Sequence, residues 1–196
     1  MHTIDITIKN TDSSRDSWRY LTQSPFEITA PIGDSMMNFL ANYLGFGTEY
    51  VEHEIMTVFI NGSPVDDLHT AHVPAEARIG LGAFAPGVAG MTMCRKSPIA
   101  ILRDEITFSG NSDEIQKITE GVITLLLFNS VMHDKGLEVL QQGIIVPAAR
   151  LTELLEEQQE TVHDAQIDGT PIATGALALW TQKNPQLKIQ LRVECA

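Results

Sequence analysis

The chain has 196 residues, of which 43% are hydrophobic and 19% charged, an ordinary composition for one large folded domain or two small ones. Its formal net charge is −12, and acidic residues outnumber basic ones in both halves. An evenly acidic surface repels the phosphates of nucleic acids and of anionic lipids, so neither is an expected partner. The charge favours solubility.

Features of the chain that bear on its location point to a reducing compartment. The two cysteines, Cys94 and Cys195, make neither a disulfide framework nor a CxxC metal motif. The first residues lack the basic and apolar regions of a signal peptide. The longest apolar run, from Val122 to Phe128, is far shorter than the ~20 residues that span a bilayer. We therefore expect a soluble, cytoplasmic protein of bacterial type.

The chain opens with a strand pattern. Ile4, Ile6 and Ile8 alternate with polar residues, which predicts a half-buried strand from Thr3 to Lys9. The polar stretch from residue 10 to 17 is typical of a loop or wide turn. Residues 18–22 and 26–30 have an extended pattern, with Pro25 between them.

A helix is predicted to begin near Asp34, where Asp34 or Ser35 can accept the free amide hydrogens of the first turn. Gly45 can adopt the left-handed conformation that ends it. The apolar residues at helical spacing in this segment are Met36, Phe39, Leu40, Tyr43 and Leu44. This stripe predicts a core-facing helix.

Two strands around an Asn-Gly turn follow. Residues 55–60 form a predicted strand, and Asn61-Gly62 is a strong hairpin signal because both positions tolerate positive φ. A polar excursion runs from Asp66 to Glu76. Residues 78–84 are again extended, with glycines 80 and 82 on one face, and residues 99–108 predict one or two short strands.

The second half has a different pattern. Helical spacing predicts a helix from Asp113 to Val131, and Pro147 suits the first position of another. Residues 176–181 and 187–193 predict a terminal β-hairpin. The chain is therefore expected to be α+β, with one domain over residues 1–110 and another, two helices and a hairpin, over residues 111–196. The short junction Ser109-Gly110-Asn111 suits an interdomain link or a tight turn.

The element order of the first half resembles the β-grasp, ubiquitin-like sulfur-carrier proteins of thiamine and molybdopterin biosynthesis. The residues that carry the resemblance run from Thr57 to Val65 and from Ala83 to Gly90. It implies an N-terminal β-grasp module followed by a smaller α+β extension.

The same resemblance implies a glycine-bearing tail whose carboxylate is activated. The tail-like motif is Gly87, Ala89 and Gly90. Ala89 replaces the first glycine of the family's Gly-Gly ending, and the chain continues past Gly90. Carrier chemistry would therefore need cleavage after Gly90, and a turn between strands is the alternative interpretation of this segment.

A polar cluster, Asp66, His69 and His72, lies in the excursion after the hairpin. Two histidines three residues apart can share a helix face as metal ligands, and Asp66 could be a third ligand. A solvated loop explains the same residues with fewer assumptions. We expect no metal and no cofactor.

Cys94 is the candidate catalytic residue. Its neighbours Arg95 and Lys96 are cationic, and cations stabilise the nucleophilic thiolate. A structural cysteine at a strand end is the alternative.

Two functions from different classes follow from these patterns. The first is a non-catalytic protein-interaction or carrier-like module on a β-grasp fold, acting through a protein partner or through self-association, including a homodimer. The alternative is a sulfur-relay or thiol-dependent small enzyme that uses Cys94 with nearby His69 or His72. A carrier processed at Gly90 is a third option. The sequence contains no strong catalytic motif, so catalysis is the less expected function.

Overall fold

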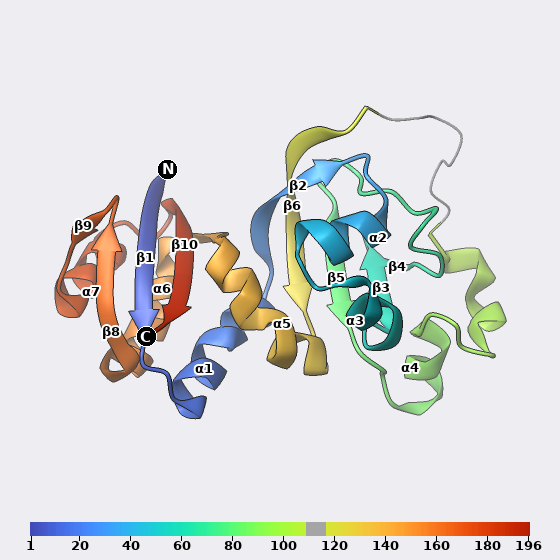
Figure 1. The fold of residues 1–196 in the computed structure, drawn as a ribbon, viewed down its shortest axis with the longest axis horizontal. Coiled ribbons are helices and arrows are strands. Elements are labelled where there is room, and N and C mark those ends of the chain that lie inside the picture. The colour runs from blue at the N-terminus through green and yellow to red at the C-terminus, as the bar shows by residue number, and fades with distance from the viewer. Residues whose placement is uncertain (109–116) are drawn as a thin grey trace. The chain divides into compact units, whose positions relative to one another are not determined.

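The computed structural model describes residues 1–108 and 117–196, and its internal contacts divide these residues into two compact units. Unit 1 consists of residues 1–27 and 133–196, and unit 2 of residues 28–132. The chain passes from one unit to the other within strand β2 and within helix α5 (Figure 1).

The described residues form a mixed α+β fold, which agrees with the predicted class at that level. The strands are β1 (His2–Ile8), β2 (Phe26–Ile32), β3 (Thr57–Ile60), β4 (Ser63–Pro64), β5 (Arg78–Gly82), β6 (Thr119–Leu127), β7 (Ile144–Pro147), β8 (Val162–Ile167), β9 (Thr170–Pro171) and β10 (Lys188–Cys195). The α-helices are α1 (Asp12–Arg19), α2 (Met36–Asn38), α3 (Thr48–His53), α4 (Gly87–Met93), α5 (Asn129–Gln142), α6 (Ala148–Gln158) and α7 (Thr174–Lys183). Shorter turns are η1 (Tyr20–Gln23), η2 (Phe39–Tyr43), η3 (Ala100–Ile106) and η4 (Gln159–Thr161).

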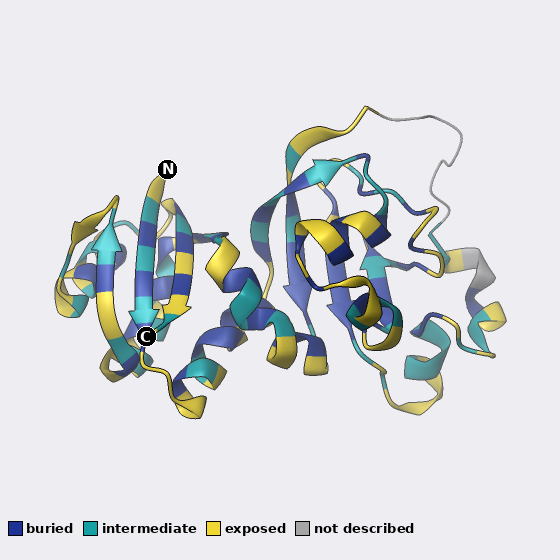
Figure 2. Cartoon of the chain, in the orientation of Figure 1, coloured by how far each residue is buried: buried dark blue, intermediate teal, exposed yellow. Residues whose placement is uncertain are grey.

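Strand β1 is the centre of unit 1, whose strand order is β7-β10-β1-β8-β9. It runs parallel to β10 and antiparallel to β8, with Ile4 opposite Leu191. Burial alternates along both β1 and β10, as Figure 2 shows. The predicted strands over Thr3 to Lys9 and over residues 187–193 are therefore confirmed.

The segment after β1 was predicted wrongly as a loop and an extended stretch. Helix α1 begins at Asp12, and the Thr11 side chain accepts a hydrogen bond from the Ser14 amide at 3.2 Å. Trp18 is fully buried, and its Nε1 donates to Thr161 Oγ1 at 2.8 Å. The N-cap at Thr11 and the burial of Trp18 thus stabilise a helix in a segment whose other residues are mostly polar.

The predicted terminal hairpin is also wrong in its first strand, because residues 174–183 form helix α7. Leu177 and Thr181, four residues apart, are fully buried, whereas Leu179 is exposed. That spacing matches one face of a helix. The second strand, β10, pairs with β1 and β7 instead of with a hairpin partner.

The helix predicted from Pro147 is confirmed as α6. Pro147 is its N-cap, with ψ of 141°, and Leu151 and Leu155 on its buried face are fully inaccessible to solvent.

Unit 2 has the strand order β4-β3-β5-β6-β2. The helix predicted near Asp34 begins as α2, where the Ser35 side chain accepts from the Asn38 amide at 3.1 Å. It continues as the π-type turn η2, so Tyr43 leaves the apolar stripe and is exposed. Gly45 follows with φ of 70°, as expected for the residue that ends a helix.

The Asn61-Gly62 turn is confirmed, with φ of 52° and 88°, and it joins β3 to β4. Strand β5 then pairs antiparallel with β3 and parallel with β6. Residues 119–127 are strand β6 and not part of a helix, while residues 109–116, including the start of the predicted helix and the 109–111 junction, lie outside the described residues. Ile123, Leu125 and Leu127, at alternate positions, are almost completely buried. Hydrogen bonding to the parallel strand β5 stabilises this segment as a strand.

Residues 100–106 are the 3₁₀ segment η3, where short strands were predicted. In the part of the chain that the structure covers, no helix is both long and apolar enough to cross a lipid bilayer.

The two units differ from the predicted division into residues 1–110 and 111–196. Strand β1 belongs with β10, nearly the whole chain length away, so the first 27 residues belong to the unit that holds the C-terminal residues. Parallel pairing at such sequence separation leaves no local pattern to detect.

The Trp18–Thr161 hydrogen bond gives a test of unit 1. In T161V, Trp18 Nε1 and the Gln158 carbonyl, which also bonds the Thr161 hydroxyl, both lose a partner. We expect the free energy of unfolding, followed by tryptophan fluorescence in urea, to fall by about 1–3 kcal/mol. The matched variant T170V, in exposed β9, should change it by less than about 0.5 kcal/mol. Equal losses in both variants would contradict this assignment.

Candidate functional site

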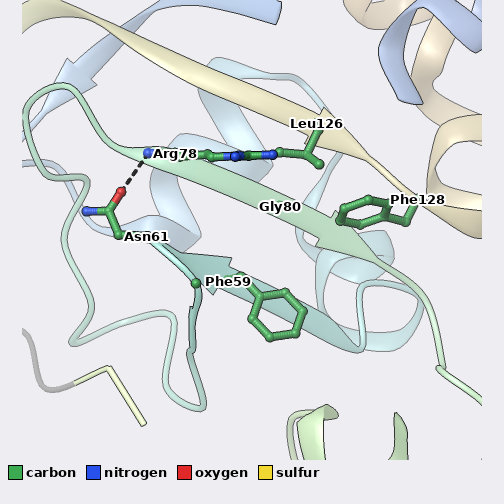
Figure 3. Close-up of a pocket in the computed structure, with 7 residues that line it drawn as sticks. Phe59, Asn61, Arg78, Gly80, Leu126 and Phe128 are labelled. Carbon is green, nitrogen blue, oxygen red and sulfur yellow. Dashed lines mark hydrogen bonds between the residues drawn. The ribbon is translucent and has the colours of Figure 1, made fainter. Parts of the chain in front are cut away.

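An open apolar groove of about 550 Å³ lies on the sheet of unit 2 (Figure 3). The residues that line it are Phe59, Asn61, Gly62, Arg78, Gly80, Leu126 and Phe128. They come from β3 and its turn, from β5, and from β6 and the residue that follows it. Its size is that of a typical recognition pocket, about 300–1,000 Å³.

The floor of the groove is a row of directly opposed residues. Gly80 pairs with Phe59 on one side and with Leu126 on the other. A Cβ at Gly80 would lie 3.0 Å from Phe128 Cε2, so the absence of a side chain at Gly80 lets the Phe128 ring pack closely against β5 at the wall of the groove. Figure 3 shows the Phe128 ring against β5 and the Phe59 ring at the neighbouring strand β3. Both aromatic residues are half-buried.

The other face of this sheet is the core of unit 2. The alternate residues Val58, Ile60, Ile79, Leu81, Leu125 and Leu127 are fully buried. Apolar residues of α2, η2 and α3, including Met36, Phe39 and Val51, are equally buried. Since side chains alternate across a strand, Phe59, Gly80 and Leu126 face away from that core.

The rim of the groove is polar at the Asn61 end. Asn61 Oδ1 accepts a hydrogen bond from the Arg78 amide at 2.8 Å, which holds the turn against β5. The Arg78 side chain is exposed and extends toward Leu126 (Figure 3). Among the described residues, no carboxylate lies within 4.0 Å of its guanidinium.

The predicted polar cluster does not assemble into one site. The Asp66 carboxylate accepts from the buried Arg103 at 2.6 Å. His69 Nε2 lies 3.9 Å from the Glu52 carboxylate, and His72 Nδ1 lies 3.0 Å from the Gly33 carbonyl. Across residues 1–108 and 117–196, no group of three or more acidic, histidine or cysteine side chains is arranged to hold a metal ion.

Asp67, beside this cluster, is not among the site residues that the sequence predicts. Its carboxylate accepts from the His69 amide at 2.8 Å, and this backbone hydrogen bond lowers the pKa of Asp67. The bond fixes the local turn.

Cys94 is placed as a buried residue, 2% exposed, and its thiol donates to the Gly90 carbonyl at 3.4 Å. Arg95, expected to activate it, donates instead to the carbonyls of Ile55 and Val51 at 3.1 and 2.9 Å, and burial lowers the pKa of Arg95.

Lys96, the second cation expected to act on Cys94, binds the Glu52 carboxylate. Its hydrogen bond to that carboxylate is the main reason that the pKa of Glu52 is lowered. Both cations are therefore engaged away from the thiol.

The tail-like motif Gly87, Ala89 and Gly90 lies in helix α4. Gly87 has φ of 82°, and a Cβ at Gly90 would lie 2.5 Å from the Ala85 carbonyl oxygen. Gly90 is thus required by close packing within this helix, where the resemblance implied a tail whose carboxylate is activated.

Arg103 anchors residues 83–108, part of the long excursion that connects β5 to β6. Its side chain is 2% exposed and donates to Asp66, to Thr107 Oγ1 at 3.0 Å and to the carbonyls of Thr92 and Cys94. One buried guanidinium thereby joins α4, η3 and the residues after β4.

Several exposed apolar side chains come from residues 84–106, after β5. They are Phe84, Val88, Ile101, Leu102 and Ile106, and we call them the excursion patch. Val88, Ile101 and Leu102 are each more than 70% exposed. Large exposed apolar side chains are candidates for contact with another protein.

No protein-family model, curated protein or solved structure matches this chain.

The anchoring role of Arg103 can be measured directly. R103M removes the buried guanidinium from four acceptors, one of which is the carboxylate of Asp66, and we expect unit 2 to lose about 2–5 kcal/mol of stability. Because Trp18 and Trp180 both lie in unit 1, the readout is hydrogen exchange of the β5 amides. The exposed-arginine control R78M should change it by less than about 0.5 kcal/mol. Similar exchange in the two variants would contradict the role.

Thiol reactivity separates the buried cysteine from a catalytic one. Cys195 is partly exposed and Cys94 is buried, so a C195S protein should react with Ellman's reagent at least about tenfold more slowly than a C94S protein. A fast, low-pH reaction of Cys94 in the folded C195S protein would instead support the thiol-dependent alternative.

Proposed function

We propose that this chain is a non-catalytic protein-interaction module and that its partner docks in the groove of unit 2. The observation that carries the proposal is the row Phe59–Gly80–Leu126, which leaves an apolar hollow on the sheet face opposite the core. Hollows bordered by aromatic rings are where binding energy concentrates in protein interfaces.

We propose further that unit 2 is a β-grasp module with a permuted strand order. The fold that it resembles has a helix across a mixed sheet with two parallel strands at its centre. Support comes from the parallel pair β5 and β6 beside the antiparallel pair β3 and β5. In this assignment β6, late in the chain, takes the place of the strand that a β-grasp chain supplies first.

The chemistry of the groove favours binding over catalysis. Its described lining residues are apolar apart from Asn61 and Arg78, and they include no nucleophile and no acid–base pair. Because Phe59 and Phe128 are already half-buried, covering the rest of each side chain would contribute about 1 kcal/mol, roughly half the value for full burial, which suits a docking surface. The buried Cys94 and the helical position of Gly90 give the thiol and carrier alternatives less support.

Self-association is a second form of the same proposal. The excursion patch favours it, because three of its side chains are more than 70% exposed and a second copy would cover them.

Site-directed photo-crosslinking tests the proposal. The full chain carrying p-benzoylphenylalanine at position 59 is irradiated in the cells that produce it, and adducts are identified by mass spectrometry. We expect one discrete protein adduct, because Phe59 lies at the groove wall. An adduct of two chain masses would identify a second copy as the partner.

The control places the same probe at Tyr20, an exposed aromatic residue in unit 1. That variant should give no adduct of the same mass. Absence of any discrete adduct from position 59, or the same adducts from both positions, would contradict docking in the groove.

A further inference from the structure

We infer that the groove of unit 2 recognises an extended segment of a partner protein in which an apolar side chain and a carboxylate lie two residues apart. This inference rests on the proposed function and adds the chemistry of the partner. It follows from the charge of the rim and from the spacing of the residues along β5.

The charge of the groove is opposite to that of the chain. The chain has a formal net charge of −12, yet none of the described residues that line the groove is acidic and one, Arg78, is basic. The Arg78 guanidinium is exposed and has no carboxylate partner among the described residues, so its donors are available. An arginine fork at the edge of an apolar surface binds a carboxylate with two parallel hydrogen bonds.

The second polar group on the rim supports the same ligand. Asn61 uses its Oδ1 to accept the Arg78 amide, which leaves its Nδ2 hydrogens as the remaining side-chain donors. The positive φ of Asn61 and the φ of 88° at Gly62 hold this turn beside the groove. The rim therefore presents donors from two side chains and suits an acceptor such as a carboxylate.

The spacing along β5 sets the register of the ligand. Arg78 and Gly80 are two residues apart on one face of the strand, or about 7 Å. An extended segment lying along β5 places its own residues i and i+2 at the same separation. One side chain then packs in the groove against the rings of Phe59 and Phe128, while the carboxylate two residues away meets Arg78.

Three blocked peptides test the inference, each with a central phenylalanine and the same charge on both sides so that either chain direction is covered. They are Asp-Ser-Phe-Ser-Asp, the neutral Asn-Ser-Phe-Ser-Asn and the basic Lys-Ser-Phe-Ser-Lys. Binding to the ¹⁵N-labelled full chain is followed from the amide shifts of Arg78 and Gly80. We expect the acidic peptide to bind about three- to tenfold more tightly than the neutral one at low salt.

Charge reversal supplies the decisive comparison. In R78E the order should invert, with the basic peptide binding most tightly, and Arg78 is exposed so the variant should fold normally. R192Q removes an exposed arginine from β10 in unit 1 and should leave the order unchanged.

The outcomes separate this inference from the proposed function. Equal binding of all three peptides, with each weakened in G80A, would overturn the carboxylate preference and leave docking at the groove intact. Peptides that shift amides elsewhere and not at Gly80 or Arg78 would overturn the inference as well. Failure of the crosslink at position 59 would be the separate sign that the groove is not the docking site.

Discussion

The parallel pairing of β5 with β6 is the contact on which the candidate binding face depends. It places Leu126 beside Gly80, where the missing side chain leaves room for the Phe128 ring, and so sets Phe128 as one wall of the groove with Phe59 as another. The same pairing puts Ile79, Leu81, Leu125 and Leu127 into the core on the opposite face. One register thus builds both the stability of unit 2 and its open surface, and a slip by one residue would exchange the two faces.

Buried guanidinium groups hold the long excursion that this topology requires between β5 and β6. Arg103 binds Asp66 and the carbonyls of Thr92 and Cys94, while Arg95 binds carbonyls of the α3 region. Residues that the sequence suggested for chemistry, Asp66 and the cations beside Cys94, therefore serve structure. Gly80 and the Asn61 turn, which the sequence predicted only as structural elements, line the groove that we propose as the docking site.

Several elements that depend on nearby residues were predicted correctly from the sequence. Strand β6, whose pairing partner is distant in the chain, was not. The Asn61-Gly62 turn, the Ser35 cap and the alternation of Ile4, Ile6 and Ile8 depend on nearby residues alone, and all three were predicted. The helical spacing of apolar residues wrongly predicts a helix over residues 119–127, because the strand there is stabilised by pairing with β5. The glycines at 80 and 82 were recognised on one face, but Phe59 and Phe128 could not be placed around them before the strand order was known.

The most direct test of this account is an NMR measurement on the unbound, isotopically labelled full chain. Nuclear Overhauser effects from the Gly80 α-protons should reach the Phe128 ring and the Leu126 side chain, and ring currents should displace the Gly80 α-proton shifts from their unstructured values. A Gly80 without these effects, or with effects to residues of the core such as Ile60, would contradict the register that makes the groove. In that case neither the docking site nor its preferred ligand would remain supported.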